Sequence, residues 1–288
     1  MVKLHKRKNS IFDILNIIIL AVISLTTLYP FVYLLIISIS PIEQVIKNGI
    51  IIIPEGFTLE YYRYVFGSTG IGSAYAATIF ITIVGTLLSL ALSSIGAYVL
   101  AQKNLPGKNI FTLIIIITMI FNGGMIPSYL VVKGLGLIDS LWSLIIPNAI
   151  YAFWLIVMRN FFQSIPASLS ESARIDGCSE YRILFAIIIP LSMPILATLA
   201  LFFGVSQWNQ YFNAIIYINS PGKQPLQVLI RRMYQSYMSV SANGDSLPPP
   251  VETIRAATIM VATLPILCVY PFLQRYFVQG IMVGAVKG

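Results

Sequence analysis

Six long apolar stretches dominate this sequence of 288 residues. None of them contains Asp, Glu, Lys, Arg or His, and each approaches or exceeds the roughly 20 mostly apolar residues that a helix needs to cross a bilayer. Hydrophobic residues make up 57% of the chain and charged residues 10%, whereas soluble domains carry about 25% charged residues. The sequence therefore predicts an all-α, polytopic membrane protein with six transmembrane helices, at residues 14–39, 72–101, 110–132, 140–158, 183–207 and 256–273.

Basic residues predict the orientation of these helices. The N-terminal arm, residues 1–13, is rich in Lys and Arg, and the apolar stretch after it is too long for a signal peptide and lacks a small-residue cleavage site. With this arm in the cytoplasm, eleven of the 18 Lys and Arg residues fall on the cytoplasmic side, in the shorter loops. The positive-inside rule then predicts that both termini are cytoplasmic. The net charge of +8 follows from this topology, and no basic stripe interleaved with aromatics indicates a nucleic-acid partner.

The residue types that carry catalysis, metal binding and ion coupling are sparse. His5 is the only histidine, and Cys178 and Cys268 are expected in a loop and a helix, so neither a His/Cys metal site nor a disulfide is expected. No G-x-x-x-x-G-K-[ST] phosphate loop occurs, so the chain is not itself a P-loop ATPase. Ionisable residues within membrane helices mark proton relays and charged-substrate sites, and the six stretches have none. These observations indicate a transport subunit that is not an enzyme, holds no cofactor, moves a neutral hydroxyl-rich solute and takes its energy from another subunit.

Small and hydroxyl residues in the second stretch predict close helix packing. Gly85, Ser89 and Ser93 recur at a spacing of four, which lets backbones approach closely, and Thr78, Thr82 and Thr86 form a neighbouring stripe. Proline residues inside the helices are expected to kink them because they lack a backbone donor. These are Pro30, Pro190, Pro194, Pro265 and Pro271.

One polar interruption, between the fourth and fifth stretches, predicts a rigid turn between two helices. Ser164 and Pro166 resemble a helix start, and this helix is expected to end at about Arg174. Gly177 then supplies a left-handed or close-contact backbone conformation, and Ser179 caps the next helix. The predicted topology places this elbow in the cytoplasm.

The spacing from Glu171 to Pro190 resembles the E-A-A-(x3)-G-(x9)-I-x-L-P loop of importer-type permeases of ATP-binding-cassette (ABC) transporters. Ser172 replaces the first of the two Ala residues, and Ile189 replaces the Leu. Residues 274–280 and 284–288 are similar to the closing residues of the second permease subunit of the maltose transporter. The chain thus resembles the binding-protein-dependent carbohydrate-uptake permeases, and residues 122–127 look like the subgroup that imports oligosaccharides.

This resemblance implies a type I ABC importer permease fold and a set of partners. The implied partners are a second, related permease, two ATPase subunits that bind ATP and Mg, an external solute-binding protein, a sugar substrate and membrane lipid, in a bacterial or archaeal plasma membrane. Residues 1–288 would form one transmembrane domain, with a cytoplasmic coupling loop at 159–182, an external loop at 208–253 and a cytoplasmic tail at 274–288. The alternatives left open are a permease for another solute, such as an amino acid or phosphate, and a secondary transporter.

The resemblance also implies roles for individual residues. The elbow would sit in a groove of the ATPase, with Glu171 meeting a basic partner residue and Gly177 permitting the close turn, while Asp176 either stabilises that turn or faces the partner. The implied coupling residues are Glu171, Ser172, Ala173, Asp176, Gly177 and Pro190. Gly284, Lys287 and Gly288 would reach toward the ATPase dimer interface; a frayed tail is the other interpretation.

Aromatic and amide residues where the fifth stretch ends form a candidate substrate pathway: Gln207, Trp208, Asn209 and Tyr211. Aromatic faces and amides together suit neutral carbohydrate, but Trp and Tyr also form interfacial belts, and both interpretations stay open. In the following loop, residues 226–238 are expected to be helical. The matching loop of the maltose-type permeases contacts the solute-binding protein, so the resemblance implies a docking role.

Overall fold

The computed structural model describes residues 11–48, 51, 53–67, 70–242, 252–265 and 267–268. All regular structure in these residues is helical, which confirms the predicted all-α class. The elements in chain order are α1 (Ile11–Ile39), α2 (Ile42–Asn48), α3 (Glu60–Gly67), α4 (Ile71–Ala101), α5 (Lys108–Ile120), α6 (Met125–Gly134), α7 (Trp142–Ile145), η1 (Ile146–Asn148), α8 (Ala152–Gln163), α9 (Ala167–Ile175), α10 (Glu180–Ile183), η2 (Leu184–Ile188), α11 (Ile189–Leu191), α12 (Met193–Trp208), α13 (Phe212–Tyr217), η3 (Pro221–Lys223) and α14 (Leu226–Ala242). Residues 252–265 and 267–268 are also helical.

The chain divides into two compact units. The first consists of Met1–Thr69 and Arg232–Leu264. Its described core is small and joins the end of α1 to α2 and to Ala256, and the Tyr62 hydroxyl lies 2.7 Å from Ser38 Oγ. Most of α1 is exposed although it is the most apolar helix by composition, which is the pattern of a helix that faces lipid or another protein.

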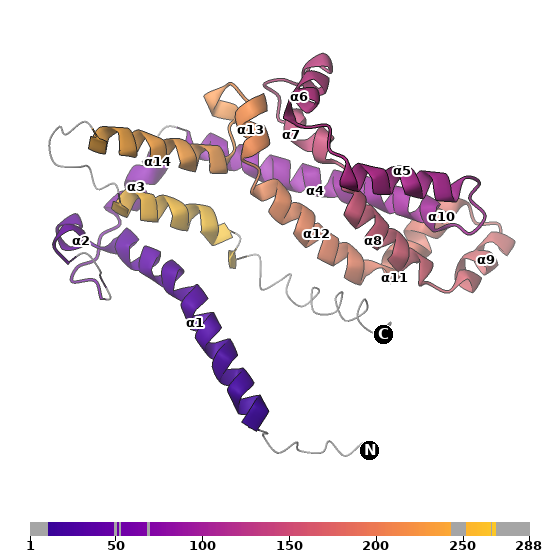
Figure 1. Ribbon diagram of the computed structural model, residues 1–288, viewed down its shortest axis with the longest axis horizontal. Coiled ribbons are helices and arrows are strands. Elements are labelled where there is room, and N and C mark those ends of the chain that lie inside the picture. Colours follow the sequence, from indigo (N-terminus) through magenta and orange to yellow (C-terminus); the bar gives the residue numbers. More distant parts are fainter. Residues whose placement is uncertain are drawn as a thin grey trace. The chain divides into compact units, whose positions relative to one another are not determined.

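The second unit consists of Gly70–Arg231 and Pro265–Gly288, and α4 forms its centre. Helices α8 and α12 pack most extensively against α4, as Figure 1 shows along the purple helix. The small-residue stripe of α4 is in the contact: Ser89 and Ser93 are fully buried, and a Cβ on Gly85 would come within 2.8 Å of Gln207 on α12. The predicted close approach of helix backbones is therefore confirmed.

Three of the expected continuous spans are broken in the structure. The axes of α5 and α6 differ by 116°, those of Trp142–Asn148 and α8 by 51°, and those of Glu180–Leu191 and α12 by 83°. The break within 183–207 agrees with the kink predicted at Pro190 and Pro194, and the breaks within 110–132 and 140–158 are additional to the predicted proline kinks. In the first of these, Gly124 has φ +87, a conformation that L side chains rarely adopt, and its N–H bonds to Asn122 Oδ1 at 3.0 Å instead of continuing the helix.

The number of membrane spans depends on how these breaks are counted. In the described residues, α1 and α4 are long and apolar enough to cross a bilayer alone, and up to five spans result if each bent pair counts as one. The sixth expected span, 256–273, continues beyond the described residues, so the six-helix count stays a prediction.

Prolines lie beside some of the breaks, such as Pro147 in η1 before α8, but not every proline breaks its helix. Pro190 and Pro194 flank Ser192, where the axis bends, whereas α1 continues through Pro30 as one helix. Pro265 lies at the end of the described helix 252–265, and Pro271 lies outside the described residues.

Candidate functional site

The elbow between the fourth and fifth predicted spans has the expected layout of helix, glycine turn and helix. Helix α9 ends at Ile175 with Asp176 as its C-cap, and Gly177 has φ +78. The N–H of Cys178 bonds to the Ala173 carbonyl at 2.9 Å and that of Gly177 to the Arg174 carbonyl at 3.0 Å, which is the hydrogen-bond pattern of a Schellman motif. A Cβ at Gly177 would meet no atom within 4 Å, so it is the left-handed φ of the backbone, and not a lack of space, that favours glycine here.

Ser179 starts the second helix of the elbow as predicted. Its Oγ accepts the N–H of Arg182 at 3.4 Å, so it caps α10. The predicted cap at Ser164 was wrong: Ser164 follows the last residue of α8, and its Oγ donates to the Phe161 carbonyl at 2.6 Å. The residue before a proline avoids the helical region, so α9 begins only after Pro166.

The predicted coupling residues lie on two sides of the elbow. Glu171, Ser172, Asp176 and Gly177 are exposed, whereas Ala173 is 7% exposed and packs in the core beneath α9. This arrangement leaves a polar, accessible face on a helix that is anchored by one small side chain.

Pro190 stands in the first turn of α11, directly after the π-helix η2. It thus marks irregular backbone on the route from the elbow to α12. The predicted tail residues Gly284, Lys287 and Gly288 lie outside the described residues.

A cluster of side chains that the sequence interpretation missed ties the elbow to α4. Arg174 Nε donates to Glu180 Oε1 at 2.6 Å, and Arg174 Nη2 donates to Glu180 Oε2 at 3.2 Å. The Tyr98 hydroxyl donates to Glu180 Oε2 at 2.5 Å, and Arg174 Nη2 also donates to Gln102 Oε1 at 2.9 Å. The hydrogen bond to Glu180 raises the pKa of Arg174 above its usual value. The opposite charges of Arg174 and Glu180, on either side of the glycine turn, could have predicted their ion pair from the sequence. No sequence pattern predicts the contact between Glu180 and Tyr98.

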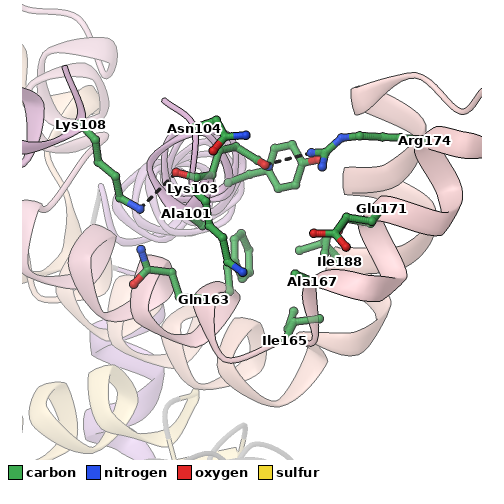
Figure 2. A pocket seen from close by; sticks show the side chains of 14 residues that line it. Ala101, Lys103, Asn104, Lys108, Gln163, Ile165, Ala167, Glu171, Arg174 and Ile188 are labelled. Atoms are coloured by element: carbon green, nitrogen blue, oxygen red, sulfur yellow. Dashed lines mark hydrogen bonds between the residues drawn. The ribbon is translucent and has the colours of Figure 1, made fainter. Parts of the chain in front are cut away.

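A cavity of about 730 Å³ lies beside this cluster, between the ends of α4, α8 and α9. Figure 2 shows Glu171 on one wall and Lys103, Lys108 and Gln163 on others. Lys108 Nζ donates to the Gln102 carbonyl at 3.1 Å. Acidic and basic groups thus face one opening, which suits contact with a charged partner side chain.

The candidate pathway residues do not share one open surface. Gln207 and Trp208 are 1% and 8% exposed, and Trp208 meets the ring of Tyr75 edge-on at 6.5 Å between centroids. Asn209 is exposed and accepts a hydrogen bond from Gln227 at 3.1 Å, and Tyr211 is half-buried. In this conformation Gln207 and Trp208 pack inside the protein, and only Asn209 and Tyr211 offer contact area at the surface.

The loop after the fifth predicted span contains the expected helix, which runs over Leu226–Ala242. An unexpected junction, centred on Asp139, precedes it. The Asp139 carboxylate accepts the N–H groups of Asn219 and Ser220 at 3.0 and 2.8 Å and the Ser220 hydroxyl at 2.5 Å, and Lys223 Nζ lies 3.4 Å away. These bonds, the Ser220 hydroxyl first, lower the pKa of Asp139 below its ordinary range. The junction joins the segment after α6 to the segment before α14.

Comparison with known proteins places these features in context. A family model described as "Binding-protein-dependent transport system inner membrane component" matches residues 93–283. The chain is 45% identical to the "Polygalacturonan/rhamnogalacturonan transport system permease protein YtcP" of Bacillus subtilis, over 98% of this chain and 100% of that protein. It is 30% identical to the "Arabinooligosaccharides transport system permease protein AraQ" of Halalkalibacterium halodurans, over 98% of this chain and 100% of that protein.

One solved structure extends this likeness to three dimensions. It is described as "Crystal structure of a bacterial ABC transporter involved in the import of the acidic polysaccharide alginate". One of its chains is 35% identical to this chain and aligns with a TM-score of 0.85, covering 96% of this chain and 100% of that one.

Proposed function

The chain belongs to the family of binding-protein-dependent transport system inner membrane components, ABC transporter permease subunits that are not themselves enzymes, and from that premise we propose that it is one permease of an ATP-driven importer of oligosaccharides. The observation that carries the proposal is the elbow at Glu171–Gly177. It presents an exposed polar face on a short helix that ends in a glycine-locked turn. A rigid turn of this kind can transmit movement from a separate ATPase subunit to the transmembrane helices. A separate ATPase is needed because the sequence contains no phosphate loop of its own.

The proposed assembly contains a second, related permease, two ATPase subunits that bind ATP and Mg, and an external solute-binding protein. The elbow docks in the ATPase with Glu171 against a basic side chain, and the tail at 284–288 reaches the ATPase dimer. Both termini are then cytoplasmic, and the outer loops that include Asp139 and Lys223 face the binding protein. Alternating access follows: closure of the ATPase dimer pulls on the elbow, and the helices open outward to receive solute.

The substrate class rests on the relatives, whose names specify saccharides. The sequence favours a neutral sugar because the predicted spans carry no ionisable side chain. One of the similar proteins described above is named for an acidic polysaccharide, alginate, however, so the charge of the sugar stays a prediction. Amino-acid, phosphate and secondary-carrier alternatives have no support among those relatives.

Glu171→Lys in the complete transporter tests the elbow's role. A lysine would face the proposed basic partner residue, so we expect solute-dependent ATP hydrolysis to be lost while the subunit still inserts in the membrane. Glu60→Lys, on the exposed part of α3, is the matched control and should leave hydrolysis unchanged. Full solute-dependent hydrolysis in Glu171→Lys would refute the proposed contact.

The solute is tested with the purified binding protein. We expect saturable binding of neutral oligosaccharides, or of uronate-containing ones if the charge prediction is wrong. Binding of an amino acid or phosphate without any response to sugars would overturn the substrate class.

A further inference from the structure

Helix α9 has little apolar contact with the rest of the second unit, whereas the second helix of the elbow, α10, is anchored by the fully buried Ile183. Of the nine residues of α9, only Ala173 is buried. A helix attached through one methyl-sized side chain cannot pull strongly on the core beneath it, because apolar contact energy grows with buried area. Polar contacts therefore matter more here than in the well-packed helices α8 and α12.

The chain path from the elbow to α12 is also irregular. After α10, which has four residues, the backbone forms the π-helix Leu184–Ile188. It then bends by 83° between Leu191 and Met193. Because π-helical turns and breaks of this kind interrupt the regular i→i−4 ladder, this route is a poor rigid connection.

The Glu180 carboxylate offers a second route, which bypasses that irregular segment. It bonds to Arg174 on α9 through both oxygens and to the Tyr98 hydroxyl on α4. Tyr98 is 6% exposed, and its helix is the one on which α8 and α12 pack. A displacement of α9 therefore reaches the central helix of this unit across one carboxylate.

We propose that Glu180 and Tyr98 are positioning residues that fasten the coupling elbow to α4, so that movement of the elbow turns into movement of α4. This inference rests on the proposed permease function. Neither residue needs to touch the ATPase: Tyr98 is buried within this chain, and Glu180 acts through Arg174 and Tyr98. The role thus differs from that of the exposed Glu171.

The expected effect is moderate because the ion pair is partly hydrated. The Arg174 and Glu180 side chains are 39% and 54% exposed, so solvent screening weakens their attraction. Hydrogen bonds to charged groups are stronger than bonds between neutral groups. For the loss of one such bond, reduced because the pair is partly exposed, we expect the amount of sugar moved per ATP to fall about three- to tenfold.

The test measures two quantities in the complete, reconstituted transporter: the amount of sugar moved per ATP hydrolysed, and the amount of ATPase attached to the permease. Tyr98→Phe removes only the hydroxyl, and Glu180→Gln removes the charge and replaces one accepting oxygen by an NH2 donor. Both should lower the sugar moved per ATP about three- to tenfold, with unchanged ATPase attachment. Tyr64→Phe and Glu60→Gln, at exposed positions of α3, are the matched controls and should retain the wild-type ratio.

Two further results separate positioning from a simple loss of fold. Arg174→Glu combined with Glu180→Arg restores an ion pair across the turn and should recover part of the ratio lost in Glu180→Gln. Tyr98→Phe and Glu180→Gln together should lose no more than Glu180→Gln alone, because Tyr98 acts only through the Glu180 carboxylate. Additive losses, or a wild-type ratio in Tyr98→Phe, would overturn the inference.

Failure of the proposed function would look different. In that case the wild-type complex itself would show no binding-protein-dependent uptake, and no variant would change it. Robust wild-type uptake with an unchanged ratio in Tyr98→Phe refutes only the role of the Glu180–Tyr98 contact.

Discussion

Gly85→Ala tests the close packing of α4 on α12, which forms the centre of the second unit. A Cβ at Gly85 would lie 2.8 Å from Gln207 Cδ and Nε2 and 3.1 Å from its Cγ. Non-bonded carbon atoms prefer separations of about 3.5–4.0 Å, so Gln207 must move. That side chain is 1% exposed and contacts Gln210, which bonds to the Leu144 carbonyl at 2.9 Å, so it has little free space.

The expected cost follows from two opposing effects. Overpacking a filled core costs about 1–3 kcal/mol. Replacing Gly by Ala inside a helix returns up to about 1 kcal/mol. The net expectation is a loss of about 1 kcal/mol, or on the order of 2–4 °C in the melting temperature by the scaling of soluble domains.

The assay is thermal unfolding of the purified chain in detergent. Gly72→Ala is the matched control, since Gly72 lies on the same helix, is exposed and has no atom within 4 Å of its added Cβ. Its melting temperature should stay unchanged or rise slightly. The double variant Gly85→Ala/Gln207→Ala should recover part of the loss because the clash is removed. A Gly85→Ala variant as stable as Gly72→Ala would refute the contact between Gly85 and Gln207.

Three further predictions concern the turns around the site. Gly177→Ala should destabilise the elbow by about 1–2 kcal/mol because the φ of +78 at this position disfavours a Cβ, and Gly177→Asn should cost less. The assay for both variants is solute-dependent ATP hydrolysis. Equal hydrolysis with Ala, Asn and Gly at position 177 would contradict the requirement for a left-handed backbone. Ser179→Ala should remove the cap of α10 and destabilise this helix by about 1 kcal/mol. Amide hydrogen exchange over residues 180–183 should become faster, and unchanged exchange there would exclude a capping role for Ser179. The pKa of Asp139 is lowered in the fold, so the stability it contributes is present at neutral pH and is lost only as the pH falls below the ordinary Asp range near about 3.9. Amide exchange at residues 217–223 should therefore accelerate in strong acid in the wild type, whereas Asp139→Asn should show fast exchange already at neutral pH; slow exchange in the variant would contradict this role of the carboxylate.

Composition and spacing sufficed for the helical class, the family and the elbow. Apolar runs without charge predict helices in lipid, because every backbone polar group must be satisfied within the segment. Gly177 and Ser179 could be placed because a helix end needs a left-handed residue and a helix start needs a side-chain acceptor, and both are local requirements.

The breaks and the side-chain contacts needed three-dimensional information. Pro190 and Pro194 predicted a kink near Ser192 but not its angle of 83°, and the π-helix at Leu184–Ile188 lies in an uninterrupted apolar run for which hydropathy has no signal. The bond from Tyr98 to Glu180 joins residues 82 positions apart, and the Asp139 junction joins residues about as distant. The burial of Gln207 depends on Gly85 and that of Trp208 on Tyr75, both on α4, and the sequence of their own segment contains no sign of these contacts.

Uptake into proteoliposomes tests the central claim most directly, namely that the elbow at Glu171–Gly177 lets a separate ATPase drive transport through this chain. Vesicles that contain the chain with its partner permease and the ATPase subunits, supplied with binding protein and ATP, should accumulate a labelled oligosaccharide. Accumulation should cease when the ATPase subunits are omitted. Equal accumulation in vesicles that contain this chain alone, without ATP, would contradict the claim.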